Sequence, residues 1–209
     1  MSDKIIANNN NLLTTGWYGK IPSLGDFISR RLPLDFINLW DHWLQQTITQ
    51  SQIQLGDNWV NHYLVSPIWR FILMPGICGD KMWIGILMPS VDKIGRYFPL
   101  TIATPLESDS TSFFTALSAQ SWYQSLEQLA LNTLNITLMP DDIDQALADH
   151  PFPQYEVPEH SPLVDNFTDW WKINNPHNLI GYNTVTLPDV NRLVQYVESS
   201  AERLFIDMG

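Results

Sequence analysis

A hydroxyl group, a carboxylate and a guanidinium group lie close together near the start of the chain, on Ser23, Asp26 and Arg30. A nucleophile beside a carboxylate is an arrangement that hydrolases use, so this segment is a candidate for covalent chemistry. A hydrolase also needs a general base, and no histidine lies nearby in the sequence. Because Pro22 and Gly25 occupy turn-forming positions, the favoured interpretation is a plain turn in which Asp26 accepts hydrogen bonds from local backbone amides.

A second group of polar residues separates two apolar segments, in the stretch 89–97 that reads PSVDKIGRY. A loop that leaves two buried strands in this way is a common place for a binding site. The guanidinium groups of Arg70 and Arg96 suit bidentate pairing with a carboxylate, either inside the fold or on a partner. An internal ion pair of Arg96 with Asp92 or Asp26 is an equally good interpretation.

The sequence contains none of the familiar nucleophile-elbow, phosphate-loop, dinucleotide-binding or zinc-protease motifs. Its five histidines are scattered and its one cysteine cannot form a thiolate cluster, so we expect no metal site. Asp141, Asp142 and Asp144 are candidate ligands for a hard cation, but acidic residues in the first turn of a helix also complement its dipole, which is the favoured interpretation. Cys78 is expected to be a buried apolar residue. We expect no cofactor and no catalytic activity.

The composition indicates a folded cytoplasmic protein that does not bind nucleic acid. Apolar residues make up 44% of the 209 residues, enough for a core that needs neither disulfide nor metal. A net charge of −11 argues against nucleic-acid binding, which depends on clustered Lys and Arg. The N-terminus lacks the apolar stretch of a signal peptide, and no apolar run approaches the roughly 18 residues of a membrane span. The single cysteine suits a reducing compartment.

The charge is distributed unevenly along the chain. Residues 1–104 carry eight basic and seven acidic side chains, whereas residues 105–209 carry three basic and fifteen acidic ones, so the two halves have charges of +1 and −12. The two halves therefore present different electrostatic fields to a partner.

The elements that position these residues can be read from the spacing of apolar side chains. A short strand is predicted at residues 15–19, and a structured loop follows at 20–31. From Asp35 onward apolar residues recur at helical spacing, which predicts a helix that Asp35 caps and Gly56 ends. A further short helix is predicted over residues 58–64.

Three strands are predicted next, over residues 68–74, 81–88 and 97–104. The segment from Met82 to Met88 is apolar on both alternating faces, so we expect other elements to cover both sides of that strand. Helices on the two faces of a sheet satisfy this requirement.

Helices and strands alternate in the second half of the chain as well. The predicted elements are a helix of about six turns from Ser110 or Thr111, an acidic helix over 140–149, a proline-rich loop over 151–162, strands over 167–173 and 179–185, and a helix from Pro188 or Asp189. The whole pattern predicts an α/β three-layer sandwich, a mixed β-sheet with helices on both faces. We expect a single domain over residues 14–209, behind a flexible leader at 1–13.

The segments described above resemble the signature of the TagF/ImpM family of type VI secretion accessory proteins. The resemblance rests on GWYGKIPSLGDFISRRLP at 16–33, FINLWDHWL at 36–44, SPIWRF at 66–71 and GILMPSVDKIGRYFPLT at 85–101. It covers residues 16–101, and beyond residue 104 only Trp170-Trp171 and Leu187-Pro188 continue it. The resemblance implies a cytoplasmic, non-catalytic, post-translational repressor of type VI secretion.

The resemblance also implies a partner, the forkhead-associated-domain scaffold protein of that secretion system. We expect the two motif loops and their neighbours to bind it. The candidate partner-binding residues are Lys20, Ser23, Asp26, Arg30, Arg31, Trp69, Arg70, Ser90, Asp92, Arg96 and Tyr97.

Two alternatives remain open from the sequence. In the first, the same loops hold a small ligand or a weak hydrolytic site, with Ser23 or Ser90 as the reacting or hydrogen-bonding group. In the second, the protein is a structural accessory subunit of the secretion apparatus. The oligomeric state does not follow from the sequence.

Overall fold

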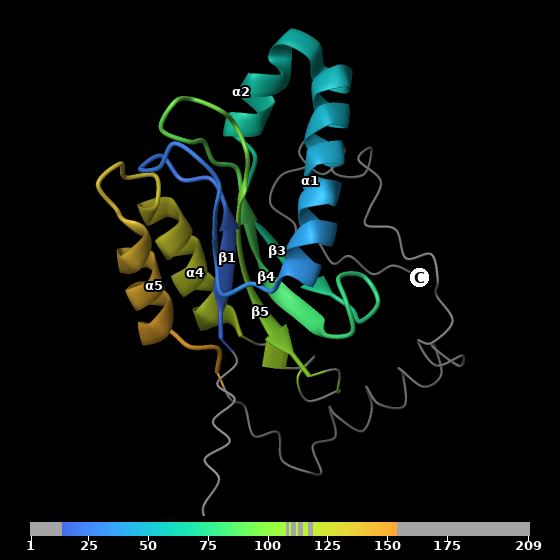
Figure 1. The fold of residues 1–209 in the computed structure, drawn as a ribbon, viewed down its shortest axis with the longest axis vertical. Helices are drawn as coiled ribbons and strands as arrows, with labels where there is room; N and C mark the ends of the chain where they lie inside the picture. The colour runs from blue at the N-terminus through green and yellow to red at the C-terminus, as the bar shows by residue number, and fades with distance from the viewer. Residues whose placement is uncertain (1–13, 108, 110–111, 113–114, 117–118, 154–209) are drawn as a thin grey trace, which may run out of the picture.

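The computed structural model describes residues 14–107, 109, 112, 115–116 and 119–153, and Figure 1 shows the path of the chain. In chain order the elements are β1 (Gly16–Gly19), β2 (Ile28–Arg30), α1 (Leu34–Leu55), α2 (Trp59–Leu64), β3 (Trp69–Leu73), β4 (Met82–Met88), β5 (Leu100–Leu106), α4 (Gln120–Asn132) and α5 (Pro140–Asp149). The predicted leader, the strands over 167–173 and 179–185 and the last helix lie outside the described residues.

The five strands form one sheet in the order β2-β1-β5-β4-β3, and every neighbouring pair is antiparallel. The predicted α/β class is confirmed, but the described strands do not form the mixed sheet that we expected. Turns and loops without a crossover helix connect β3 to β4 and β4 to β5. Such connections return the chain beside itself, which gives antiparallel neighbours, whereas parallel neighbours need a crossover.

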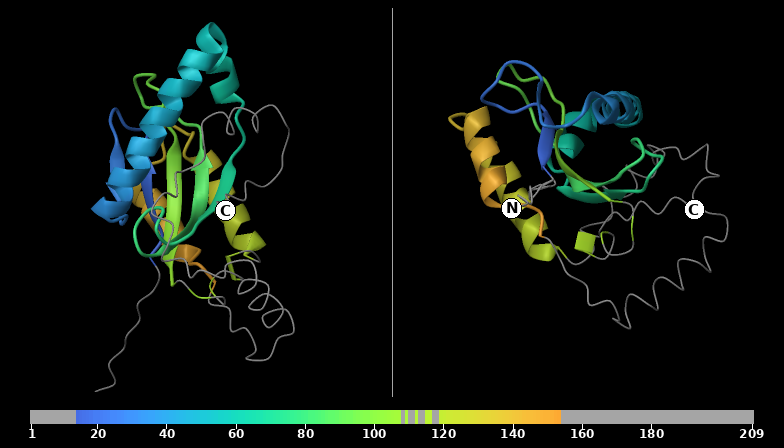
Figure 2. Two further views of the ribbon diagram at one scale, coloured as in Figure 1. Left: turned by 90° about the vertical axis from the view of Figure 1, so that its right-hand side faces the viewer. Right: turned by 60° about the horizontal axis from the view of Figure 1, so that its bottom comes forward.

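Helices cover both faces of the sheet, as predicted (Figure 2). β4 shows why: Trp83 packs in the cluster on the α1 side, whereas Ile84 and Ile86 pack in the cluster on the side of α4 and α5. Because successive side chains of a strand point to opposite faces, a strand that is apolar throughout needs a cover on each side.

α1 lies on one face of the sheet and buries its aromatic residues there. Phe36, Trp40 and Leu44 are almost fully buried, and the Trp40 indole Nε1 donates a hydrogen bond of 2.8 Å to Thr101 Oγ1 in β5. The prediction that Asp35 caps this helix was wrong, because Pro33 occupies the cap position without a side-chain hydrogen bond and Asp35 lies in the first turn. Gly56 ends the helix with a φ of 52°, as its lack of a side chain permits.

The opposite face is covered by α4 and α5. The helix of about six turns predicted from Ser110 or Thr111 is interrupted, because Ala119 has a ψ of 46° and the continuous helix α4 starts only at Gln120. α5 keeps its predicted bounds, with Pro140 in its first turn and the Asp142 carboxylate accepting a hydrogen bond of 2.9 Å from the Met139 amide. That contact satisfies one of the free amides near the start of the helix.

Two strands differ from the sequence prediction. β2 lies inside the stretch predicted as a loop at 20–31 and pairs with β1. β5 begins at Leu100, later than predicted, and continues through Pro105 to Leu106. The pairing with β1 ends at Ala103, so Pro105 lies beyond it and its missing amide hydrogen interrupts no bond to β1.

Candidate functional site

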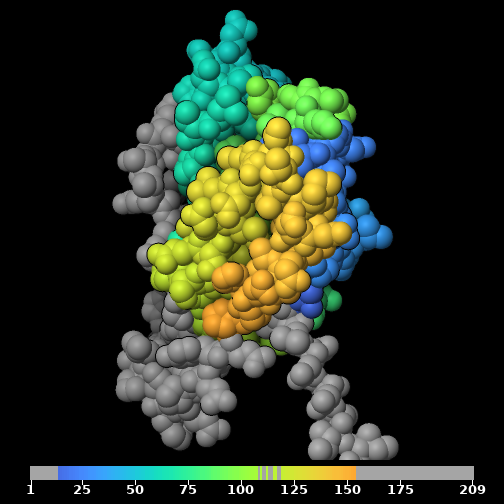
Figure 3. Space-filling view, turned by 90° about the vertical axis from the view of Figure 1, so that its left-hand side faces the viewer, coloured from blue at the N-terminus to red at the C-terminus, as the bar shows by residue number. Residues whose placement is uncertain are grey.

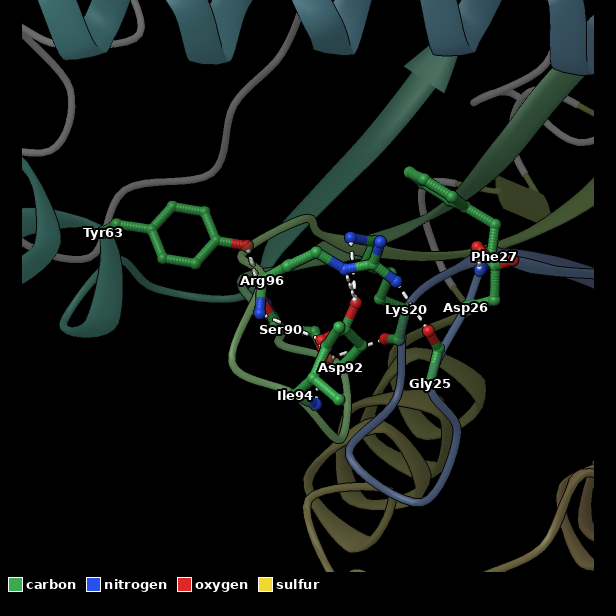
Figure 4. Close-up of polar contacts among 9 residues, drawn as sticks. All are labelled: Lys20, Gly25, Asp26, Phe27, Tyr63, Ser90, Asp92, Ile94 and Arg96. Atoms are coloured by element: carbon green, nitrogen blue, oxygen red, sulfur yellow. Dashed lines mark hydrogen bonds and ion pairs between the residues drawn. The ribbon is translucent and has the colours of Figure 1, made fainter.

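A buried carboxylate, Asp92, lies at the centre of the two motif loops (Figure 4). Its Oδ1 accepts hydrogen bonds from the backbone amides of Ile94, at 3.1 Å, and Arg96, at 2.9 Å. Its Oδ2 lies 2.7 Å from Arg96 Nε and 3.0 Å from Lys20 Nζ. The Asp92 carboxylate thus stabilises the conformation of its own loop and links that loop to the ammonium group of Lys20 in the other loop.

The surroundings of Asp92 favour its charged form. Burial alone would raise the pKa of this carboxyl group, but the hydrogen bonds from the Arg96 amide and guanidinium, the Lys20 ammonium and the Ile94 amide outweigh it and hold the pKa well below its usual range. The internal ion pair of Arg96 with Asp92, one of the two sequence interpretations, is therefore present, and Lys20 joins it.

Three hydrogen bonds to backbone carbonyl oxygens join the two loops. The Lys93 amide donates to Leu24 O at 2.8 Å, and Arg96 Nη2 donates to Gly25 O at 2.6 Å. In the interior, Ser90 Oγ donates to Lys20 O at 2.8 Å. The two loops, residues 20–27 and 89–97, therefore form one unit, which we name the loop platform.

Aromatic side chains support the loop platform from α2. Tyr63 Oη donates to Ser90 O at 2.8 Å and accepts from the Ser90 amide at 2.9 Å. Trp59, Tyr63 and Tyr97 pack together with ring centroids 4.8 to 5.6 Å apart. Edge-to-face and stacked contacts of this kind fix the orientation of the rings, so the 89–97 loop is braced against α2.

A second aromatic group supports the first loop. The Phe27 ring stacks on Tyr18 and meets Phe98 edge to face, with centroids 5.9 and 4.7 Å apart. Lys20 Nζ lies 4.7 Å from the centroid of the Phe27 ring, so the same ammonium group contacts both a carboxylate and a π face. The Phe27 side chain nevertheless stays 43% exposed.

Arg30 and Arg31 lie away from the centre of the platform and contact α5. Arg31 Nη1 lies 2.9 Å from Asp144 Oδ1, and Arg30 Nη1 lies 3.7 Å from Asp144 Oδ2. The indole Nε1 of Trp17 also donates to Asp144 Oδ1, at 2.8 Å. The sequence suggests that Asp144 complements the helix dipole or binds a cation. In the structure it joins α5 to the β1–β2 edge of the sheet.

Arg70 pairs inside the fold. Its guanidinium binds both carboxylate oxygens of Glu127 on α4, and Nη1 donates to Gln120 Oε1 at 2.7 Å. The bidentate pairing expected for Arg70 is thus made with Glu127, a residue that no sequence pattern singles out. Trp69, the neighbouring candidate, is buried in β3.

The structure divides the candidate partner-binding residues into two groups. Lys20, Trp69, Ser90 and Asp92 are buried, so they shape the site and cannot touch a partner in this conformation. The exposed or half-exposed candidates are Ser23, Asp26, Arg30, Arg31, Arg70, Arg96 and Tyr97. Their role in binding stays a prediction.

Two exposed residues of the loop platform were missed by the sequence reasoning. Ile94 is 69% exposed at the tip of the second loop, and Phe27 is exposed on the first. Both stand inside the motifs quoted above, and the signal that could have found them is an apolar residue in a polar loop, within two positions of a glycine. Gly95, at a φ of 88°, makes the turn that carries Ile94 outward.

Within the described residues, neither serine of the hydrolytic alternative is hydrogen-bonded to a side chain that could act as a base. Ser90 Oγ is buried and donates a hydrogen bond to Lys20 O. Ser23 Oγ is buried without a hydrogen-bond partner among the described residues. Asp26 accepts a hydrogen bond from the Phe27 amide at 2.8 Å, as in the plain turn predicted for it.

One comparison with known proteins identifies a family, and a second finds a similar solved structure. A sequence profile described as TagF N-terminal domain, type VI secretion system-associated, matches residues 16–150. The chain is similar to the crystal structure of PA0076 from Pseudomonas aeruginosa PAO1, with a TM-score of 0.65 and 33% identity, over 88% of this chain and 77% of that one. No curated protein matches the sequence. Within the described residues, no helix is long and apolar enough to cross a membrane.

Proposed function

Because the chain belongs to the TagF N-terminal domain family of type VI secretion system-associated proteins, we propose that it is a negative regulator of that secretion system. It acts in the cytoplasm, after translation, by binding the forkhead-associated-domain scaffold protein. It does so without catalysis, through the exposed rim of the loop platform: Asp26, Phe27, Lys93, Ile94 and Arg96.

The observation that carries the proposal is the way the loop platform is built. Asp92, Lys20 and Ser90 are almost fully buried, and they hold two loops in one fixed arrangement. A surface that is already ordered loses little conformational entropy when it binds. Ordering of this kind favours recognition of another protein.

The chemistry of the rim also supports a protein partner. Phe27 and Ile94 offer apolar surface, while Lys93 and the half-exposed guanidinium of Arg96 add positive charge. Aromatic residues and arginine are enriched in protein interfaces, where they provide much of the binding energy. The occupied hydroxyl of Ser90 gives no comparable support to a hydrolytic site.

The test is a binding measurement with the purified scaffold protein. We expect the double variant Lys93→Glu/Ile94→Asp to bind at least about tenfold more weakly, because it removes an exposed apolar anchor and reverses a charge at the rim. Neither side chain is buried, so the variant should fold normally, as circular dichroism can check. In cells, overproduction of the variant should no longer block secretion.

Ile53→Asp is the matched control. Ile53 is 70% exposed on α1, so it is as exposed as Ile94 but lies outside the loop platform. Equal binding by the wild type and the Lys93→Glu/Ile94→Asp variant would exclude the platform as the interface. Failure of the wild-type chain to bind the scaffold at all would exclude the partner.

A further inference from the structure

An exposed apolar surface lies at residues 131–139, which comprise the end of α4 and the turn that joins it to α5, and we name this segment the knuckle. Its side chains Leu131, Leu134, Ile136 and Met139 are between 46% and 72% exposed. Four large apolar side chains so exposed in nine successive residues are unusual, since scattered single exposed residues are the norm.

The knuckle is a hydrogen-bonded turn. The amide of Leu134 donates to Leu131 O, and that of Asn135 donates to Asn132 O, at 3.1 and 3.0 Å. Asn135 Oδ1 accepts from both the amide and the hydroxyl of Thr137. Half-buried Leu138 packs against the core and anchors the turn, so its neighbours are held outward in a fixed arrangement.

The surroundings of the knuckle are acidic. Residues 119–153 contain five carboxylates and neither lysine nor arginine, but Glu127 pairs with Arg70, and Asp144 pairs with Arg30 and Arg31. Asp141 lies two residues after the knuckle and has 90% of its side chain exposed, and its Oδ1 is 3.4 Å from Arg30 Nη2. Asp142 and Asp149 are exposed on α5 and have no basic partner within the described part of the chain. The apolar surface therefore has a negatively charged border along α5.

The knuckle lies at the same end of the molecule as the loop platform. Figures 1 and 3 show the turn between α4 and α5 beside the two loops, and Leu24 of the first loop packs in the same core cluster as Leu138. A partner held on the loop platform would bring its neighbouring segments close to the knuckle.

We propose that the knuckle is a second docking surface, which takes a basic amphipathic segment of a partner protein. The apolar side chains of such a segment would cover Leu134, Ile136 and Met139, and its lysines or arginines would lie along Asp141, Asp142 and Asp149. Opposite charges at the border of an apolar contact select the partner and its orientation. A second copy of this chain carries the same acidic border, so charge repulsion disfavours self-association through this face.

The probe is a fluorescein-labelled helical peptide of 14 residues, with leucines on one face and lysines on the other. Anisotropy titrations with the full chain should show saturable binding that weakens as salt rises. A peptide of the same pattern with glutamates in place of the lysines should bind at least tenfold more weakly. Both results follow from an apolar contact with an acidic border.

Variants locate the binding on the protein. Ile136→Ser should weaken binding of the leucine–lysine peptide about tenfold, and Leu134→Ser/Ile136→Ser further, whereas Ile53→Ser on α1 should leave it unchanged. Asp141→Asn should weaken it severalfold, mainly at low salt. Ile136 has the most exposed side chain of the set, so its single variant stays informative if the double variant unfolds.

Three results would overturn the proposal. The first is equal affinity of the wild type and Ile136→Ser for the peptide, which would indicate non-specific attraction to an acidic protein. The second is no binding by the full chain, which would mean that another part of the chain covers the knuckle. The third is a concentration-dependent dimer in analytical ultracentrifugation that Ile136→Ser abolishes, which would assign the surface to a second copy.

Discussion

Among single residues, Asp92 has the largest influence on the candidate site. It is buried, and its two oxygens accept hydrogen bonds or ion pairs from two backbone amides, a guanidinium and an ammonium group. A carboxylate with so many donors can remain charged in the interior, whereas an unpaired buried charge would be strongly destabilising. The shape of both motif loops therefore depends on one negative charge.

We expect Asp92→Asn to reduce the free energy of unfolding by about 3 kcal/mol at pH 7, because it leaves the buried ammonium group of Lys20 without its counter-ion. The pKa of Asp92 is lower in the folded state, so the stability it contributes is fully present above the unfolded pKa of about 3.9 and is lost as the pH falls through the folded pKa. Chemical denaturation should show that the wild type and Asp92→Asn differ less in their free energy of unfolding below pH 4 than at pH 7.

Asp26→Asn is the control. Asp26 is exposed, and its carboxylate accepts a hydrogen bond from the amide of the neighbouring Phe27 rather than from a buried charged group. It should change stability little at either pH. Adding Lys20→Met to Asp92→Asn should recover part of the loss by removing the unpaired charge. A difference between wild type and Asp92→Asn that is independent of pH would contradict this account.

At the scale of elements, the centre of the sheet depends on close approach of three strands at Gly85. This residue of β4 pairs with Phe71 in β3 and with Ala103 in β5. A Cβ atom at this position would lie 2.1 Å from Ile102 O and 2.9 Å from the Phe71 ring. Glycine is therefore required here by space, at an ordinary strand backbone conformation.

Gly85→Ala should destabilise the protein by about 3 kcal/mol, at the upper end of the usual range for overpacking, because the first neighbour it meets is backbone that cannot rotate away. Thermal and denaturant unfolding would measure the loss. Gly25→Ala should change stability by less than about 0.5 kcal/mol, since nothing lies within 4 Å of a Cβ there. Similar effects of the two substitutions would show that β4 and β5 can move apart.

Across the whole molecule, the two helical layers are attached to the sheet in different ways. α1 is attached by buried aromatic residues. α5 is attached by Ile143 and Leu147 together with a polar contact, in which Asp144 meets Arg31, Arg30 and Trp17. That contact links residues far apart in the sequence and closes the sandwich at the β1–β2 edge.

We expect Asp144→Ala to loosen α5 without loosening α1, because it removes the partly buried acceptor of a charged hydrogen bond, worth about 1.5–3 kcal/mol. Hydrogen–deuterium exchange should accelerate over residues 140–149 and stay slow over the first half of α1. Asp149→Ala is the control on the same helix. It removes an exposed hydrogen bond of 2.9 Å from Gln145 on α5 itself, but also a negative charge at the C-terminal end, where it opposes the helix dipole, so the exchange of α5 should change little. Faster exchange in both helices would mean that the layers unfold together.

The local pattern of the sequence determined most of the elements. The periodicity of apolar residues predicts α1, α2, β3 and β4 close to their bounds, because a helix or strand must place its apolar side chains on a core face at fixed spacing. Pro140 and the acidic residues after it predict the start of α5. The same logic predicts covered faces on both sides of β4. The sequence also suggests the ion pair of Arg96 with Asp92 as one interpretation, since both groups belong to one short loop.

Only the tertiary structure decided which distant groups meet. Lys20 with Asp92, Arg70 with Glu127 and Trp17 with Asp144 join residues whose sequence separation gives no signal. Many carboxylates in an acidic chain could serve each cation equally well, and the choice depends on strand order and on which helix covers which face. Burial of the site residues was likewise decided by tertiary structure. In the sequence, Lys20, Ser90 and Asp92 are polar residues of predicted loops, and they become buried because the two loops pack against each other.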